Sequence, residues 1–196
     1  MFSDGRSKKV ILVSHCILNQ NSISDGTADY PAVNENVLSL LIESEVGIIQ
    51  MPCPETLCLG LDRGDIHGGE RAIIIENTRI RHDMEKNESI EIINNIVNQL
   101  LFQIEQYKQN GFTILGVIGI NRSPSCGVNT TSKNNKEVEG EGILIEILRE
   151  KLEKKGINID MIGIKATETD EALKLIQKLI DKCGEFSGQV FASDNS

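Results

Sequence analysis

Three cysteines each follow an apolar stretch of the sequence, where a metal ligand or a nucleophile could act. Cys16 follows VILVSH, Cys53 follows GIIQMP and Cys126 follows IGINRSPS. They are far apart in the sequence, so they can meet only through tertiary structure. A free cysteine is often a small buried hydrophobe. Three cysteines at equivalent positions, each beside Ser or Pro, nevertheless favour a shared site, whereas Cys58 and Cys183 do not follow the pattern and are predicted to be structural.

The number of ligands limits the chemistry of such a site. Structural zinc usually has four ligands, with paired cysteines two to four residues apart, and no such pair spans these three. Cys53 and Cys58 have four residues between them, so a zinc site that uses Cys58 or a histidine stays open. A redox dithiol would show C-x-x-C, which is absent. Iron–sulfur clusters usually take four thiolates, so three would leave one iron open to substrate as a Lewis acid.

A carboxylate and a hydroxyl lie next to these cysteines. Glu55 stands two residues after Cys53 in CPE, and Ser123 stands three residues before Cys126 in SPSC. Beside an open metal site, they could transfer protons and orient a polar substrate. The alternative roles are structural: Glu55 could cap a helix N-terminus, and Ser123 and Ser125 could bind turn amides.

The elements that must position these residues alternate between strands and helices. Apolar runs rich in β-branched residues predict buried strands over residues 8–14, 46–52, 112–120 and 157–165, with a short strand over 72–77. Apolar residues at helical spacing predict helices over residues 34–44, 84–109, 142–156 and 169–184, and Asn34 is the expected cap of the first. The segment 137–142 reads as a solvated connection.

This alternation predicts one Rossmann-like α/β domain over residues 1–196, with a mostly parallel sheet and helices on both faces. Residues 1–8 and 189–196 are expected to be flexible. Ligands of open parallel sheets bind beyond the carboxyl ends of the strands, which is where the three cysteines would lie. The strand order is not determined by the sequence.

Composition and charge exclude several classes of partner. Hydrophobic residues make up 39% of the 196 residues and charged residues 25%, as in soluble globular proteins. The net charge of −9 argues against general nucleic-acid binding, and DRGDIHGGER with TRIRH is the only candidate basic patch. No apolar run approaches the roughly 20 residues that span a bilayer, and the polar N-terminus is unlike a signal peptide. A cytoplasmic protein with reduced thiols is therefore expected.

The motifs VSHCILN, CPET and SPSCG, in this order at predicted strand ends, resemble the thiouracil desulfurase (TudS) family. These bacterial and archaeal proteins remove sulfur from thiolated nucleobases. The resemblance implies a 4Fe–4S cluster on Cys16, Cys53 and Cys126, with one iron not ligated by protein that takes the thiocarbonyl sulfur. It also implies that Glu55 moves the proton of the attacking water and that Ser123 orients substrate or water. The C=S bond would become C=O by hydrolysis, without net redox change.

The loop after the first strand departs from the family pattern. The family usually has SACLLG and an RYDG-like stretch, whereas this chain has SHCILNQN and ADYPA, with His15 and Asn19 in place of small residues. The chain is therefore predicted to be a divergent member whose substrate need not be thiouracil. His15 could contact substrate, adjust the cluster's potential, or simply bind the backbone. His67, in DIHGG, is predicted to lie in a solvated turn.

Three functions stay open on the sequence. The leading one is a desulfidase that acts on a small thiolated compound such as a thiouracil-like base, with no membrane partner and an undetermined oligomeric state. The second is a non-catalytic sulfur- or metal-binding protein, in which Glu55 would be dispensable. The third is a metal-free cysteine hydrolase or transferase, which would depend on Cys16 or Cys126 alone.

Overall fold

The computed structural model describes residues 2–187, with side chains up to Lys182. The predicted flexible tail 189–196 and the side chain of Cys183 lie outside this described part. In order along the chain, the elements are β1 (Lys9–Ser14), α1 (His15–Leu18), η1 (Gln20–Ser22), α2 (Glu35–Glu43), β2 (Gly47–Met51), α3 (Pro54–Leu59), η2 (Gly68–Glu70), α4 (Ile73–Met84), α5 (Asn87–Gln109), β3 (Thr113–Ile120), β4 (Thr130–Lys133), β5 (Lys136–Glu139), α6 (Ile143–Lys154), β6 (Met161–Ile164) and α7 (Thr169–Ser187).

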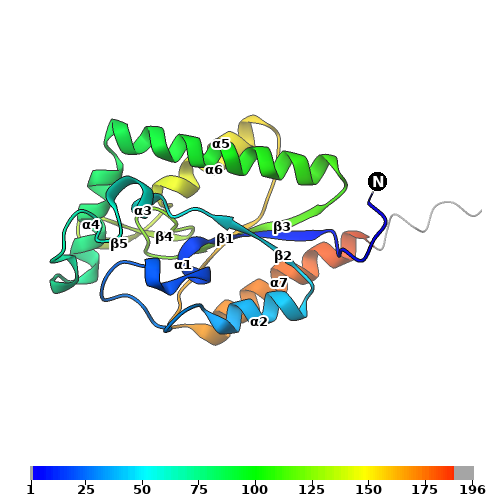
Figure 1. Cartoon of the computed structure of the whole chain (residues 1–196), viewed down its shortest axis with the longest axis horizontal. Helices are drawn as coiled ribbons and strands as arrows, with labels where there is room; N and C mark the ends of the chain where they lie inside the picture. The colour runs from blue at the N-terminus through cyan, green and yellow to red at the C-terminus, as the bar shows by residue number, and fades with distance from the viewer. Residues whose placement is uncertain (1, 188–196) are drawn as a thin grey trace, which may run out of the picture.

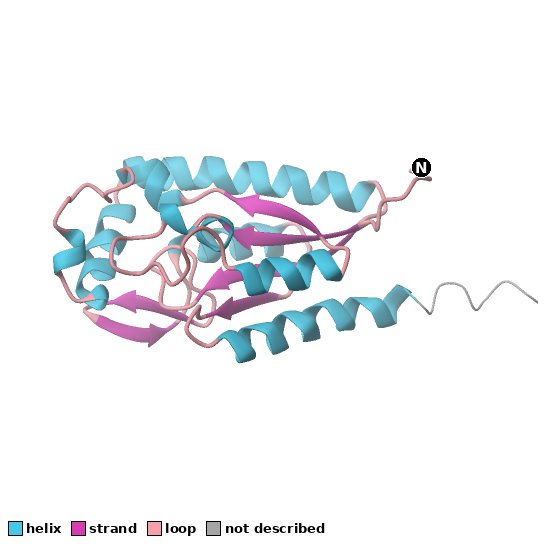
Figure 2. Ribbon diagram, turned by 60° about the horizontal axis from the view of Figure 1, so that its bottom comes forward, coloured by secondary structure: helices cyan, strands magenta, loops and turns pink. Residues whose placement is uncertain are grey.

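The main sheet has four strands in the order β2-β1-β3-β6, and all neighbouring pairs are parallel. Figure 2 shows these strands pointing toward the same end of the molecule. The chain moves from β1 outward to β2, then returns to the other side of β1 to form β3. The strand order therefore reverses between β1 and β3. In open parallel sheets, such a switch point leaves a crevice beyond the carboxyl ends of the two strands.

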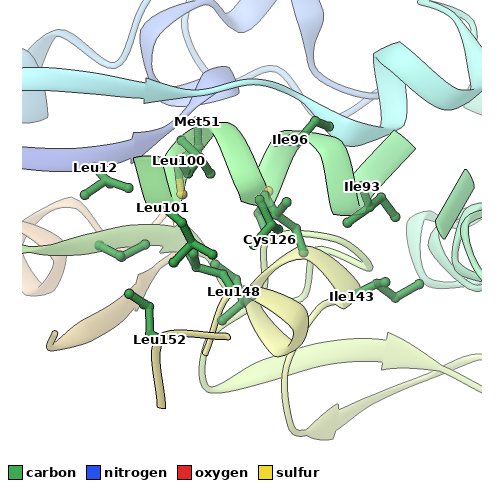
Figure 3. Packing of buried hydrophobic residues seen from close by; sticks show 14 of the residues in the cluster. Leu12, Met51, Ile93, Ile96, Leu100, Leu101, Cys126, Ile143, Leu148 and Leu152 are labelled. Carbon is green, nitrogen blue, oxygen red and sulfur yellow. The ribbon is translucent and has the colours of Figure 1, made fainter. Parts of the chain in front are cut away.

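Helices cover both faces of this sheet (Figure 1). The apolar stripe of α5 packs with α6 against one face, and α2 packs with α7 against the other. Figure 3 shows the first of these two clusters, in which Leu100 of α5 and Leu148 of α6 lie close to Met51 and Cys126. Burial of each apolar face against the sheet is what stabilises this layering. The predicted α/β fold, a parallel sheet with helices on both faces, is confirmed.

The predicted strand over residues 72–77 is wrong, because this segment begins helix α4. Its three isoleucines are only partly buried or exposed, and the residues that are buried recur at helical spacing from Glu76 to Met84. Two of these buried residues are polar and bind the hairpin opposite: Asn77 donates to Ser132 Oγ at 3.3 Å, and Arg81 donates to Thr131 Oγ1 at 3.0 Å. The hydrophobicity pattern alone does not indicate this buried face, because the segment begins with a run of isoleucines and continues with polar residues.

Two further boundaries differ from the predictions. The helix expected over residues 84–109 starts at Asn87, because Lys86 has an extended backbone (ψ 148°) that separates α4 from α5. The segment 137–142 is not simply a solvated connection, since β5 forms an antiparallel hairpin with β4. Asn134 and Asn135 at the tip have φ values of 53° and 56°, and two consecutive positive φ values are what a type I′ hairpin turn requires.

The N-terminal residues that were expected to be flexible contact the body of the protein. Phe2 packs edge-on against Phe112 with ring centroids 5.8 Å apart, and the Lys8 carbonyl accepts a hydrogen bond from the Thr113 amide at 2.8 Å.

In the part of the chain that the structure describes, no helix is long and apolar enough to cross a membrane.

Candidate active site

The switch point of the sheet holds a pocket that all three predicted cysteine ligands line. Cys16 lies in the short helix that follows β1, Cys53 precedes α3 just after β2, and Cys126 ends the turn that follows β3. Glu55 and Ser123 line the same pocket. The cavity has a volume of about 170 Å³, enough for on the order of ten water molecules. The fold thus brings together five residues that the sequence places on three separate segments.

Burial changes the acidity of the three thiols. It raises the pKa of Cys126 to about 12, an effect to which Cys53 and Glu55 add. Burial also raises the pKa of Cys16 well above its usual value, and repulsion from Cys126 and Cys53 acts in the same direction. The pKa of Cys53 is raised by burial and by Glu55, although Arg63 opposes the rise. Each thiol therefore stays protonated at neutral pH unless a positively charged partner such as a metal binds it.

This acidity predicts slow alkylation of Cys126 in the metal-free protein. At pH 8, a pKa of about 12 leaves roughly one thiol in ten thousand as the reactive thiolate, so iodoacetamide should react about a thousandfold more slowly than with an unperturbed cysteine. Timed labelling followed by peptide mass spectrometry measures this rate. The same protein unfolded in urea is the control. Equal labelling rates for Cys126 in the folded and unfolded chains would contradict the expected acidity.

Cys58, the one remaining cysteine whose side chain the structure describes, does not join the pocket residues. The Cys58 thiol donates to the Ser89 carbonyl oxygen at 3.7 Å and packs against the core, away from the pocket lining. Among the side chains that the structure describes, residues 2–182, no three Cys, His, Asp or Glu side chains converge as ligands of a single metal ion. Three thiols spaced around one pocket suit a cluster of several irons better than one zinc ion, because each iron can take one thiolate.

Glu55 is held by hydrogen bonds on both of its carboxylate oxygens. Its Oε1 accepts from Ser125 Oγ at 2.6 Å, and its Oε2 accepts from Arg63 Nε at 3.0 Å. Ser123 and Ser24 approach less closely, at 3.5 and 3.4 Å. Glu55 does lie in the first turn of α3, as the structural alternative expected, but its side chain is buried against these partners on the pocket wall.

Ser123 makes the structural contacts that the sequence suggested and also lies on the pocket wall. Its Oγ accepts hydrogen bonds from the amides of Ser125 at 3.2 Å and Cys126 at 3.0 Å, so it does bind turn amides. It also lines the pocket beside the three thiols. The turn itself is tightly packed against the start of α6, because a Cβ on Gly142 would lie 2.3 Å from the Ser125 carbonyl carbon.

Arg63 is a site residue that the sequence reasoning missed. It belongs to the candidate basic patch, yet its side chain is only 3% exposed. Besides Glu55, its guanidinium donates to the Ser22 carbonyl at 2.6 Å and to the Gly60 and Leu61 carbonyls at about 3 Å, and it lies 3.8 Å from the Cys53 sulfur. Nothing in the local sequence distinguishes it from Arg71, which is 37% exposed and paired with Asp65 and Glu76.

Three buried polar atoms in the described residues lack a hydrogen-bond partner, and all three lie beside the cysteines: Ser14 Oγ, His15 Nδ1 and Thr56 Oγ1. Leaving such groups unsatisfied costs about 1–3 kcal/mol each. Ser14 makes no hydrogen bond of normal geometry, but it lies close enough to Cys126 to favour the thiolate, and Thr56 acts similarly on Cys53. Ser14 and Thr56 are thus placed to donate to the thiolates of Cys126 and Cys53, and His15 lines the pocket, so the residues present fit an iron–sulfur cluster held by these thiolates.

The loop after β1 forms part of the wall of the pocket. Gln20 is 4% exposed and bridges the loop, because its Nε2 donates to the Cys16 carbonyl at 2.7 Å and its Oε1 accepts from the Asp29 amide at 3.1 Å. Asn19 caps η1 through the Asn21 amide. His15 lines the pocket. His67 is exposed and bonds to Glu70 at 2.8 Å, in the solvated turn that was expected.

A family model identifies the family of this chain, and two individual proteins are similar to it. The family model for 2-thiouracil desulfurase matches residues 11–158, which include all five predicted site residues. An uncharacterized protein of Methanocaldococcus jannaschii is 27% identical over 177 residues, which cover 89% of this chain and 99% of that protein. The solved structure of the [4Fe-4S]-dependent thiouracil desulfidase TudS aligns over 86% of this chain and 99% of its own, with 19% identity and a TM-score of 0.45.

Proposed function

Because this chain belongs to the 2-thiouracil desulfurase family, we propose that it removes sulfur from a small thiolated compound such as a thiouracil-like base. As a member of this family, the protein is an enzyme that cleaves a carbon–sulfur bond. The observation that carries the proposal is the convergence of Cys16, Cys53 and Cys126 on one pocket that also holds Glu55. The location proposed for this activity is the cytoplasm.

We propose that Cys16, Cys53 and Cys126 hold a 4Fe–4S cluster. When bound, the cluster supplies an iron with a site open to substrate, a Lewis acid that polarises the C=S bond. The convergence of the three thiols on one pocket supports this assignment, and the cationic irons would offset the burial that raises the pKa of these thiols. The buried Arg63 guanidinium near Cys53 would partly offset the negative charge that three thiolates and Glu55 bring to the pocket.

The chain's own residues supply the proton transfers of a hydrolysis. The overall reaction converts C=S and water into C=O and hydrogen sulfide, so no electron donor or acceptor is needed. Ser125 and Arg63 each occupy one side of the Glu55 carboxylate, and the longer contacts from Ser123 and Ser24 are weak enough for a water in the pocket to replace them. We assign to Glu55 the proton of the water that attacks the ring carbon, and to Ser123 a hydrogen bond that orients the substrate or the water.

The test is anaerobic reconstitution with iron and sulfide, followed by measurement of bound iron, sulfide and the visible spectrum. About four irons per chain and a broad absorption near 400 nm are expected for the cluster. Serine variants of Cys16, Cys53 and Cys126 should each lose iron, whereas Cys58→Ser should keep it, because Cys58 does not line the pocket. Conversion of 2-thiouracil and 4-thiouracil is then followed by chromatography. A protein that binds no iron, or binds only zinc, would contradict the proposal.

The metal-free cysteine enzyme is less well supported by the geometry. A cysteine nucleophile reacts as a thiolate and needs a low pKa or an adjacent base. Here burial raises the pKa of all three pocket thiols. A histidine could serve as that base, and His15 lines the pocket. Within the described residues, however, its Nδ1 atom makes no hydrogen bond to any of the three thiols. In the non-catalytic alternative Glu55 is dispensable, so a Glu55→Gln variant that loses turnover would favour the desulfidase over it.

A further inference from the structure

We infer that Ser125, the second serine of the SPSC motif, is the residue that positions Glu55 for the reaction. The inference rests on the proposed function, because it assigns a role within the same site. The resemblance to the family implies a role for Ser123 but none for Ser125, which was expected only to bind turn amides. The contacts of the two hydroxyls separate their roles.

The distances to Glu55 are clearly different. Ser125 Oγ lies 2.6 Å from Glu55 Oε1, a short bond of the kind that a hydroxyl makes to a carboxylate. Ser123 Oγ lies 3.5 Å from the same oxygen, at the limit of a hydrogen bond. Ser125 is also 1% exposed, so water does not compete for its hydroxyl. Ser125 is therefore the serine that fixes the Oε1 side of the carboxylate.

The hydrogen-bonding capacity of Ser123 points the same way. A hydroxyl has one proton and two lone pairs. Both lone pairs of Ser123 are taken by the amides of Ser125 and Cys126, so only its proton is left to donate. Its Oγ lies 3.2 Å from Ser125 Oγ, and Ser125 in turn gives its own proton to Glu55. Ser123 therefore keeps one proton for the substrate or water that it is proposed to orient, whereas Ser125 is the serine that is close enough to hold Glu55 firmly.

The backbone around Ser125 is rigidly placed. Its carbonyl accepts from the Leu144 amide at 3.0 Å, at the start of α6, and Gly142 packs directly against it. On the opposite side of the carboxylate, Arg63 holds Oε2. Glu55 is therefore held between one fixed hydroxyl and one fixed guanidinium. Loss of the Ser125 hydroxyl would let the carboxylate rotate away from the geometry that proton transfer needs, and misplacement of about 1 Å can cost on the order of 10²-fold in rate.

The test compares wild type, Ser125→Ala and Ser125→Thr, each reconstituted with iron and assayed on a thiouracil. Ser125→Ala is expected to keep its iron content, to change KM less than about threefold and to lower kcat by about 10- to 100-fold. Its visible spectrum is not used as a criterion, because Ser125 Oγ also lies 3.7 Å from the Cys126 sulfur. Ser125→Thr restores a hydroxyl and should recover most of kcat. Ser89→Ala is the matched control, because Ser89 is a buried serine outside the pocket, bonded to the Asp83 carbonyl.

A crystal structure of Ser125→Ala gives a readout that does not depend on turnover. The inference expects the Glu55 carboxylate to leave the position it has in wild type. It is overturned if Glu55 stays in place, if Ser125→Ala turns over like wild type, or if Ser125→Thr is as impaired as Ser125→Ala. An inactive wild type would instead count against the proposed function, and the comparison of the two crystal structures would still decide the role of Ser125.

Discussion

Replacement of Glu55 by glutamine is expected to lower kcat for thiouracil conversion by about 10²- to 10⁴-fold, the usual contribution of a positioned general acid or base. Glutamine has nearly the same size, and its carbonyl oxygen can still accept from Ser125 or from Arg63, although not from both as a carboxylate does. What is lost is the carboxylate that takes the proton of the attacking water. Iron content and the visible spectrum should be unchanged, because Glu55 is not a proposed ligand.

The measurement is steady-state kinetics on samples of matched iron content. Glu76→Gln is the control, since Glu76 is another buried carboxylate paired with arginines but does not line the pocket. Wild-type turnover by Glu55→Gln would remove the acid–base role from this residue. It would leave the binding of iron to the cysteines untouched, so the two parts of the proposed function can fail separately.

Replacement of Arg63 by methionine is expected to lower the free energy of unfolding of the metal-free protein by about 3–5 kcal/mol. The Arg63–Glu55 pair is buried on both sides, with side chains 3% and 8% exposed. Removing the guanidinium leaves a buried carboxylate without its charge partner, and it frees the three backbone carbonyls that Arg63 binds. Urea unfolding followed by circular dichroism gives the difference, provided that the slope of the transition is unchanged.

Two comparisons show whether the lost charge partner is the cause. Arg71→Met removes an exposed arginine from its ion pairs and should cost much less. The double variant Glu55→Gln/Arg63→Met removes both charges and should be less destabilised than the sum of the single variants. Strict additivity would mean that the two side chains do not interact energetically, and it would remove the electrostatic explanation.

The layers of the fold and the positions of the cysteines could be predicted because they depend on local patterns. Continuous apolar runs mark strands buried on both faces, and Cys16, Cys53 and Cys126 each follow one. The strand order could not be predicted, since it depends on which edges pair after the helices pack. Helix α4 was missed because its buried face mixes Ile80 and Met84 with polar residues such as Asn77 and Arg81, whose partners are distant in sequence.

Pocket residues that belong to short motifs could be predicted from the sequence, whereas single residues contributed by other loops could not. Cys53 and Glu55 share one short motif, so their proximity follows from the sequence. Arg63 reaches the pocket from a loop in which its backbone has a φ of 57°. No sequence pattern predicts that this residue adopts a left-handed conformation. The choice between Ser123 and Ser125 depends on hydrogen bonds that differ by about 1 Å in length, a scale at which only three-dimensional structure decides.

The assembly of the pocket from three separate strand ends has a consequence for biosynthesis. Cys16 and Cys53 are translated well before Cys126, and at roughly 5–20 residues per second the chain spends several seconds without the third thiol. β3 lies in the middle of the sheet, between β1 and β6, so the nascent chain cannot complete the sheet in that time. Iron delivered before that point would meet only two of its three proposed ligands. Cofactor maturation should therefore begin only after Cys126 has been translated.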